Sequence, residues 1–300
     1  MIYTVTFNPA IDYVVHTKTM RSGIVNRSER EEYFFGGKGI NVSMILNELG
    51  VRSKALGFVA GFTGEALEKG VSDMGIDTDF IHLKSGITRI NVKIKSGDET
   101  ELNCSGPSID EEAIAALYEK IDNMTDGDMI ILAGSIPSTL PSDIYAQILK
   151  RIEGRGVKAV VDATGKLLLN VLEYRPFLVK PNNFELAEMF DAELECTDDI
   201  VFYAKKLREM GAVNVLVSMA EDGAVLVDEQ DQVHICGVCR GTVVNSVGAG
   251  DSMLAGFIAG YMNTSDYNQA LKLGTAAGGA TTFSEGLAGH DYIMELFDTL

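Results

Sequence analysis

The sequence predicts an α/β fold in which helices cover both faces of a mainly parallel sheet. Short β-rich segments alternate with helical patterns along most of the 300 residues, which is typical of parallel sheets with helical crossovers. The segment 129–133 is apolar at every position, as expected of a strand buried on both faces. With 46% hydrophobic residues, the chain can bury a large core. We therefore expect one domain over residues 1–300.

The core elements follow from these patterns. Strands are expected where β-branched and aromatic residues cluster between turn signals, at residues 2–7, 53–59, 128–133, 157–161, 177–180, 213–218, 223–228 and 232–238. Helices are expected where apolar residues recur every three or four positions, at residues 39–49, 63–74, 110–121, 141–152, 182–189, 197–210, 249–262 and 266–283.

Two regions interrupt the alternation with extended segments that have no helix between them. These segments lie at residues 10–19, 25–35, 87–96 and 99–105. The second pair is joined through Ser96-Gly97-Asp98, a hairpin signal. They predict a small four-stranded sheet inserted into the core from about residues 10–35 and 87–106. We interpret it as a lid, because a small sheet has an open face that a ligand, the main domain or a second subunit can cover. A surface decoration is the alternative.

The charge of the chain limits its partners. The formal net charge is −18 at pH 7. Binding to nucleic acids or anionic membranes depends on an excess of Lys and Arg, so we expect neither partner and only a local phosphate pocket. No apolar run approaches the roughly 20 residues of a membrane-spanning helix. The first residues resemble a strand and lack a basic leader, so we expect a cytoplasmic protein.

The cysteines and histidines predict no metal centre. Cys236-Gly-Val-Cys239 has no second ligand pair, and the four His residues are scattered. Neither arrangement has the spacing of a zinc site. We expect reduced thiols packed in or beside a strand, and no protein-bound transition metal.

A first glycine cluster, residues 35–43, leads into a predicted helix. It lacks the GxxxxGK[ST] spacing of a P-loop and the GxGxxG of a dinucleotide fingerprint, which argues against a nicotinamide oxidoreductase. Its chemistry suits a sugar. The backbone at Gly37 leaves room for hydroxyl groups, Asn41 offers a donor and an acceptor, and Lys38 can meet an anionic group.

The third extended segment carries a polar face. Arg89, Asn91 and Lys93 alternate with apolar residues, so the two-residue period of a strand places them on one side. Asp12 lies on the first extended segment, and Asn103 lies on the strand paired with the third. We predict that this face binds a phosphosugar. Exposed charges on a strand edge are the alternative.

A second glycine cluster, residues 244–252, opens an apolar helix. Gly248 and Gly250 leave the backbone uncovered, so successive N–H groups can point at one anion, helped by the helix dipole. Asp251, in the first turn, is a candidate base. A glycine-rich turn capped by an Asp is the alternative.

These segments resemble the PfkB-type carbohydrate kinases of the ribokinase superfamily. The family's two signatures resemble residues 36–43 with Gly50 and residues 245–251 through Gly256, which lie about 200 residues apart in the expected order. Three further segments resemble the family's NxxE segment, its substrate-side loop and its nucleotide-binding turn, at residues 180–185, 134–137 and 218–223. The resemblance covers nearly the whole chain.

Two positions depart from the family pattern. Ala60 stands where the first signature usually has a Gly, and Met219-Ala220 stand where the nucleotide turn usually has Leu-Gly. Neither removes a side chain with a predicted chemical role. The resemblance implies a ribokinase-like three-layer α/β/α core with a four-stranded β lid.

The resemblance also implies roles for the site residues in ATP-dependent, Mg²⁺-dependent phosphorylation of a sugar. Asp251 would accept the proton of the attacking hydroxyl, and the N–H groups of Gly248, Ala249 and Gly250 would form an anion hole. The substrate would be bound by Asp12, Gly37, Lys38, Asn41, Arg89, Asn103 and Ser135. The nucleotide side would be formed by Lys180, Asn182, Glu185, Ser218 and Gly223, with Glu185 placing Mg²⁺ through water. A helix-dipole role for Glu185 and an N-cap role for Asn182 are the alternatives.

The cationic pair Lys38 and Arg89 suits a ketohexose that already bears a phosphate better than a neutral sugar or a nucleoside. Residues 8–12, 36–41 and 88–93 resemble the branch of the family that acts on such substrates. We expect fructose 1-phosphate, phosphorylated on O6. Tagatose 6-phosphate, phosphorylated on O1, and a catalytically silent sugar-phosphate sensor are alternatives. Several family members form dimers through the small sheet, so a homodimer is expected.

Overall fold

The computed structural model describes residues 1–300, apart from the side chain of residue 98. A ten-stranded sheet forms its centre, with strands β1 (Ile2–Thr6), β4 (Ser53–Ala60), β5 (Asp77–Thr78), β6 (Ile81–Leu83), β9 (Met129–Ala133), β10 (Lys158–Asp162), β11 (Leu178–Val179), β12 (Asn214–Ser218), β13 (Ala224–Val227) and β14 (Val233–Cys236). Their order is β14-β13-β12-β11-β10-β9-β1-β4-β5, and β6 pairs with β4. All neighbours are parallel except β12-β13 and β13-β14, which confirms the predicted mainly parallel sheet.

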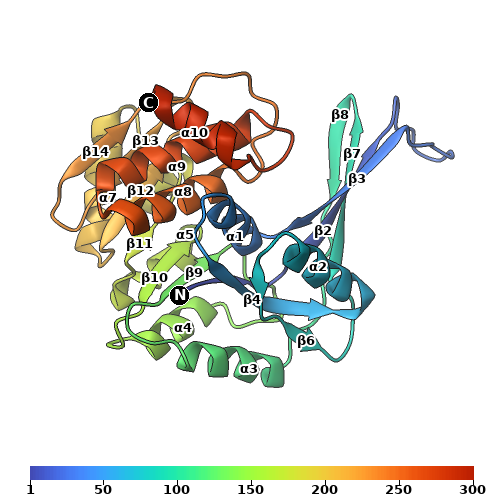
Figure 1. Cartoon of the computed structure of the whole chain (residues 1–300), viewed down its shortest axis with the longest axis horizontal. Helices are drawn as coiled ribbons and strands as arrows, with labels where there is room; N and C mark the ends of the chain where they lie inside the picture. Colours follow the sequence, from blue (N-terminus) through green and yellow to red (C-terminus); the bar gives the residue numbers. More distant parts are fainter.

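Helices form a layer on each face of this sheet (Figure 1). One layer contains α3 (Glu111–Asp122), α4 (Ile144–Ile152), α5 (Gly165–Leu169), α6 (Asn183–Phe190) and α7 (Thr197–Glu209). The other contains α1 (Lys38–Glu48), α8 (Ala249–Thr264), α9 (Tyr267–Thr282) and α10 (His290–Thr299). The helix α2 (Gly61–Asp73) follows β4. The predicted three-layer architecture is therefore confirmed. Among the described residues, no helix is both long and apolar enough to span a membrane.

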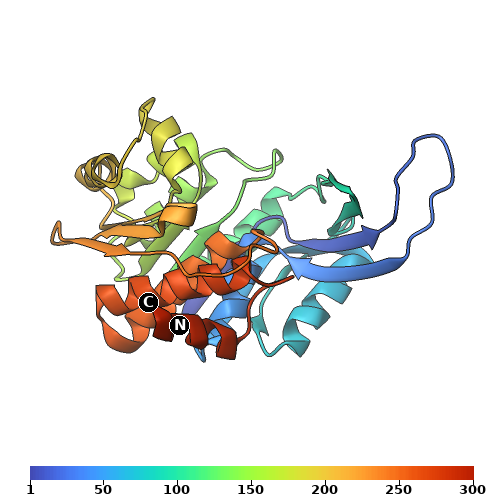
Figure 2. The same ribbon diagram turned by 90° about the horizontal axis from the view of Figure 1, so that it is seen from above.

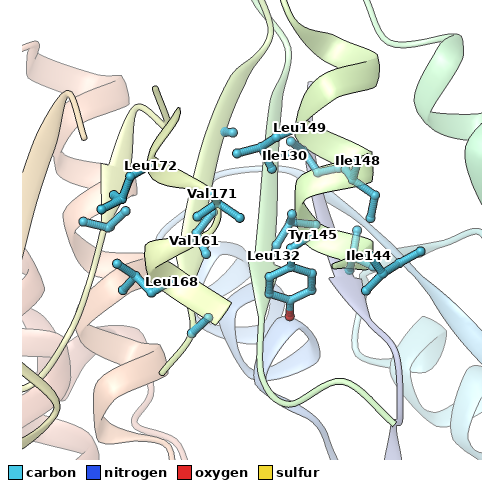
Figure 3. Close-up of a cluster of buried hydrophobic side chains, with 14 of the residues drawn as sticks. Ile130, Leu132, Ile144, Tyr145, Ile148, Leu149, Val161, Leu168, Val171 and Leu172 are labelled. Carbon is cyan, nitrogen blue, oxygen red and sulfur yellow. The ribbon is translucent and has the colours of Figure 1, made fainter. Parts of the chain in front are cut away.

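Alternation along the strands divides the core into two parts. In β9, Ile130 and Leu132 belong to the apolar cluster under α3 to α7, while Met129 and Ile131 belong to the cluster under α8 to α10. Figure 3 shows part of the first cluster, in which side chains of α4 pack on those of β9. A strand with apolar side chains on both faces can only be stable between two helical layers.

A separate four-stranded sheet projects from one side of the core (Figures 1 and 2). Its strands are β2 (Ala10–His16), β3 (Arg30–Gly36), β7 (Arg89–Ser96) and β8 (Asp98–Leu102), in the order β3-β2-β7-β8. This sheet, called the lid sheet below, confirms the predicted inserted sheet and its hairpin, in which Gly97 has a φ of +91°.

The first two lid strands are shorter than predicted. β2 ends at His16 and β3 begins at Arg30, whereas extended structure was expected up to residue 19 and from residue 25. The intervening loop bonds within itself: the side-chain amide of Asn26 accepts from the backbone N–H of Arg21 at 3.0 Å and donates to its carbonyl at 2.8 Å. These local bonds replace the strand ladder.

Two strands, two α-helices and two 3-10 helices, the last at Leu172–Tyr174 and Ala220–Asp222, were not predicted. β5 and β6 have two and three residues, and α5 has five, so none is long enough to show a period. α10 is longer, with ten residues. Its buried Ile293 and Leu296 are three positions apart, the spacing of one helix face, so the sequence does contain a signal for it.

The position of α8 depends on glycines at its contact with α9. A Cβ atom on Gly256 would lie 2.6 Å from the carbonyl oxygen of Leu273, and one on Gly274 would lie 2.8 Å from that of Met253. Gly260 would meet the Cα of Ala270 at 2.7 Å. The two backbones thus approach closely, and the first turn of α8 is fixed against α9.

We expect Gly256→Ala to destabilise the fold by about 2 kcal/mol, although alanine favours a helix by roughly 1 kcal/mol. The clash is with backbone, which cannot rotate away. Asn263→Ala is the matched control, because Asn263 is exposed on the same helix and its replacement should stabilise slightly. Urea unfolding of both variants measures this. A Gly256→Ala variant as stable as Asn263→Ala would contradict the proposed close contact.

Candidate active site

The two glycine clusters meet in space. Asn41 lies on α1 and Asp251 in the first turn of α8, and the side-chain amide of Asn41 donates to Oδ2 of Asp251 at 2.8 Å. These residues are 210 positions apart in the sequence. Asp251 is only 5% exposed. The contact makes the predicted sugar-binding segment and the predicted anion-binding helix start two walls of one site.

The carboxyl group of Asp251 is held in a form that readily binds a proton. Burial raises its pKa first, and the nearby carboxylate of Asp162 raises it further, while Lys38, the Asn41 amide and Lys180 lower it. The balance raises the pKa of Asp251 to about 6. A carboxylate with this pKa is charged at neutral pH and is a better base than an exposed Asp.

The start of α8 offers backbone donors. Gly248 is the N-cap with a φ of +83°, a left-handed conformation that favours glycine. Within the described part of the chain, no acceptor contacts the N–H groups of Gly248 and Gly250. The N–H of Ala249 donates to the carbonyl of Ser246 at 3.2 Å. Of the three predicted donors, the N–H groups of Gly248 and Gly250 have no acceptor among the described residues, whereas the N–H of Ala249 is used in the turn that caps α8.

Lys38 and Lys180 flank a buried carboxylate that the sequence analysis missed. Asp162, 2% exposed, lies at the carboxyl end of β10. Its Oδ2 is 3.4 Å from the Lys180 ammonium and 3.7 Å from that of Lys38. Oδ2 of Asp162 has no hydrogen-bond partner among the described residues. The signal for this residue was its place directly after a buried strand, the edge where α/β proteins bind ligands.

These carboxylates determine where Lys38 points. Burial would lower the pKa of Lys38, but the charges of Asp162, Asp251 and Glu185 together raise it. The ammonium is therefore directed toward the acidic cluster. Lys38 and Arg89 are both predicted from the sequence to hold the substrate's phosphate. The structure places Lys38 among the carboxylates, while Arg89 lies at the lid sheet.

Asn182 and Glu185 form a capping box at the start of α6. Oδ1 of Asn182 accepts from the N–H of Glu185 at 2.8 Å, and Glu185 Oε2 accepts from the N–H of Asn182 at 2.9 Å. This is the N-cap alternative considered for Asn182. Asn182 also forms a parallel bridge with Ser218. Among the described residues no three His, Cys, Asp or Glu side chains converge as a metal cage. Oxygen donors from Asp162 and Glu185 fit Mg²⁺, which is usually held by one or two carboxylates and by phosphates.

On the lid side, Asp12 is held in one orientation. Its Oδ1 accepts from the amide of Asn91 at 2.8 Å, and Asn91 Oδ1 accepts in turn from the N–H of Cys104 at 3.2 Å. A Cβ on Gly36 would lie 3.0 Å from Asp12 Oδ2. Arg89 is fixed beside this pair by the carbonyl of Asn8, at 3.1 Å from Nε. Burial lowers the pKa of Arg89.

The predicted polar face of β7 exists, but its outer part is paired internally. The register of β7 with β2 places Lys93 opposite Val14 on the side of Asp12. The Lys93 ammonium lies 3.2 Å from Glu101, and the amide of Asn103 donates to the same carboxylate at 3.3 Å. Asn103 is exposed beyond β8 and contacts Glu101 rather than Asp12.

A cavity of about 680 Å³ opens between the lid sheet and the core. Asp12, Gly36 and Asn41 line it together with the segment 285–289. Side chains from the lid and from α1 that are predicted to bind the sugar thus face the same space. Gly37 has a φ of +131°, and a Cβ there would lie 2.5 Å from the methyl group of Thr6, so the backbone at this position must remain bare.

The last two predicted segments border the site from opposite sides. Ser135 is exposed in the loop after β9, and a Cβ on Gly134 would lie 3.8 Å from the stem of Lys38. On the other side, Gly223 has a φ of +86° and closes the turn between β12 and β13. A Cβ there would lie 2.2 Å from the carbonyl of Cys236. This turn adjoins Ser218, the last residue of β12.

The chain matches the model of the pfkB family carbohydrate kinases over residues 4–291. It is 46% identical to 1-phosphofructokinase of Bacillus subtilis, over 99% of this chain and 97% of the relative. It is 37% identical to D-tagatose-1-phosphate kinase of Bacillus licheniformis, over 96% and 94%.

Among solved structures, the tetrameric inhibited form of phosphofructokinase-2 from Escherichia coli superposes with a TM-score of 0.91 at 26% identity, covering 99% of this chain and 98% of that one. The ribokinase of Arabidopsis thaliana, 18% identical, has a TM-score of 0.82 with 99% and 98% covered, which confirms the ribokinase-like fold. These matches span the two glycine clusters that the hydrogen bond between α1 and α8 joins. The chain therefore belongs to the pfkB family of carbohydrate kinases, phosphotransferases that use ATP and a divalent metal.

Proposed function

We propose that the protein transfers a phosphoryl group from ATP to the C6 hydroxyl of fructose 1-phosphate, giving fructose 1,6-bisphosphate. The observation that carries this proposal is the bond between Asn41 and the buried Asp251. Asp251, whose pKa is raised, would act there as a base between the proposed sugar cavity and the proposed anion-binding start of α8. The name 1-phosphofructokinase of the Bacillus subtilis relative supports the substrate. Retention of Asp251 and of both helix-start glycines argues against a silent sensor.

In this mechanism Asp251 accepts the proton of the attacking hydroxyl. Phosphoryl transfer needs alignment and neutralisation of charge more than covalent help from the protein. The N–H groups of Gly248 and Gly250 and the ammonium groups of Lys38 and Lys180 would meet the charge on the transferred oxygens. Each of these donors comes from the core of the protein.

Mg²⁺ is the metal we propose, with Glu185 and Asp162 holding it through water. When bound, it would neutralise the phosphates of ATP. Ser218 and Gly223 would border the nucleotide, because their turn lies beside the start of α6.

Recognition of the sugar would fall to both walls of the cavity. Asp12, Asn41 and Asn103 and the backbone of Gly37 would bind hydroxyl groups. Arg89 would hold the phosphate already present, with Ser135 from the opposite loop. The ammonium group of Lys38 lies among the carboxylates of Asp162, Asp251 and Glu185. It would therefore lie between the phosphate of the sugar and the phosphoryl group transferred from ATP, and would contact whichever is nearer.

A C4 epimer is the second candidate substrate. Tagatose 6-phosphate is the alternative predicted from the sequence, whereas the Bacillus licheniformis relative is named D-tagatose-1-phosphate kinase. Tagatose 1-phosphate leaves the C6 hydroxyl free, as fructose 1-phosphate does, so one attacking geometry serves both. The substrates then differ only in the hydroxyl that Asp12 and its neighbours contact.

We further propose a cytoplasmic homodimer that forms through the lid sheet. Tyr33, Tyr13, Val92 and Leu102 are paired in register across all four strands. Tyr33 and Leu102 are each 64% exposed. A continuous apolar row of this kind is rarely left open to water. Assembly of the Escherichia coli relative as a tetramer is consistent with oligomers in this family.

Closure of the lid over the sugar would exclude water as a competing acceptor.

We expect an ADP-release assay to give the highest kcat/KM with fructose 1-phosphate, followed by tagatose 1-phosphate. Fructose 6-phosphate and tagatose 6-phosphate should be poor substrates, because their C6 oxygen is already esterified. Removal of Mg²⁺ with EDTA should abolish turnover, and added Mg²⁺ should restore it. Absence of turnover with all four sugars, or preference for a 6-phosphate, would refute the proposed reaction.

Asp251→Asn should lower kcat by about 10²- to 10⁴-fold. Wild-type kcat should fall as the pH drops through about 6, where Asp251 takes up a proton. Because folding raises the pKa of Asp251, its contribution to stability decreases as pH rises through the interval up to that value. The neutral variant should therefore melt above wild type at pH 8, with a smaller difference at pH 5.

Asp298→Asn, at an exposed position of α10, is the control for both measurements and should change neither. An Asp251→Asn variant that keeps most of its activity, or melts below wild type at pH 8, would contradict the assigned role.

For the dimer, light scattering after size-exclusion chromatography should give about twice the chain mass of 32.4 kDa. Leu102→Asp combined with Tyr33→Asp should give the monomer mass, because two charges would enter the apolar row. Met262→Asp, at an exposed apolar residue of α8, should leave the dimer intact. A wild-type monomer at micromolar concentration would show that the row is not an interface.

A further inference from the structure

Tyr145 is fully buried, and its hydroxyl oxygen reaches the substrate side of the site. It lies in the first turn of α4, on the face of the sheet opposite α1 and α8. Figure 3 shows its hydroxyl at the edge of the apolar cluster, pointing away from the labelled aliphatic side chains. That hydroxyl donates to the carbonyl of Gly134 at 3.0 Å. The bond crosses from the helix layer to the loop after β9.

Both backbone polar groups of Gly134 are thereby hydrogen-bonded. Its N–H donates to the carbonyl of Asp162 at 3.1 Å, and its carbonyl accepts from Tyr145. With a φ of +102°, Gly134 has a conformation that only glycine adopts without strain. The two bonds fix the direction in which the next residue, Ser135, leaves the sheet. They also hold the loop against the stem of Lys38.

The ring of Tyr145 supports a second substrate loop. It stacks on Phe7 with ring centroids 5.6 Å apart, and Phe7 immediately follows β1. The next residue, Asn8, presents the carbonyl that accepts from Arg89. One side chain therefore underlies both loops that face the sugar phosphate, through its hydroxyl at Gly134 and through its ring at Phe7.

We propose that Tyr145 is a positioning residue for the sugar phosphate, whose hydroxyl fixes the Gly134–Ser135 turn above Lys38. The inference rests on the proposed function, since it assumes that this turn faces the substrate. The alternative is that Tyr145 only fills the core. A core role is served by the ring alone, so removal of the hydroxyl separates the two.

The test uses Tyr145→Phe in the full-length protein. Loss of one hydrogen bond between uncharged groups should raise the KM for fructose 1-phosphate about 3- to 10-fold, with the KM for ATP within twofold of wild type. Tyr118→Phe is the matched control. Tyr118 donates to Gln147 of the same helix α4 at 2.6 Å and contacts no substrate loop, so its loss should change neither KM.

Two further measurements keep the inference independent of the proposed reaction. In hydrogen–deuterium exchange without ligands, the amides of residues 134–136 should exchange faster in Tyr145→Phe and at the wild-type rate in Tyr118→Phe. In a double-mutant cycle, Tyr145→Phe should have a smaller effect on KM when Ser135→Ala is already present, because both act through one turn.

Unchanged exchange at the amides of residues 134–136 in Tyr145→Phe would overturn the inference whatever the activity. Equal changes in both KM values, or additive effects with Ser135→Ala, would overturn it as well. Wild-type protein with no turnover on any ketohexose phosphate would instead refute the proposed function. The exchange measurement would still decide whether Tyr145 fixes the turn.

Discussion

The buried charge of Asp251 is the constraint on which the rest of the site depends. An ionised carboxylate removed from water is stable only with partners that replace its hydration. Here the partners come from three elements: Asn41 on α1, Lys180 after β11, and the start of α8 itself. The glycine contacts between α8 and α9 keep this helix start in place. The fold therefore positions the charge by assembling residues distant in sequence.

A second buried carboxylate, that of Asp162, brings the opposing effects on the pKa of Asp251 closer to balance. Asp162 raises the pKa of Asp251, while Lys38 and Lys180 lower it, so two negative and two positive groups share one water-poor volume. This arrangement suits a reaction that brings more negative charge. The lysines can turn toward incoming phosphates, and a metal ion can take over the pairing of Asp162. The base then keeps a pKa near neutrality without a fixed counterion.

The sequence predicts the parts of this fold that depend on local pattern. The eight core strands and eight helices expected from periodicity are all present, with shifted ends, because each buries side chains on a regular spacing. Asp162 was missed because an Asp after a strand looks like any turn residue, and only its neighbours in space distinguish it. The position of Lys38 beside Asp162 and the bond from the N–H of Ala249 to Ser246 were not predicted, because neither contact is encoded by spacing in the sequence.

The site is divided between the lid sheet and the core, and this division has a mechanistic consequence. Asp12, Asn91 and Arg89 all lie on the lid sheet, whereas Asn41 and Asp251 lie on the core. A sugar in the cavity would contact both parts, so its binding energy would favour the closed arrangement. A water molecule contacts only the lid sheet or the core at one time, so its binding would not favour the closed arrangement. The base would therefore meet an acceptor mainly when a sugar is bound, which protects ATP from hydrolysis without any additional residue.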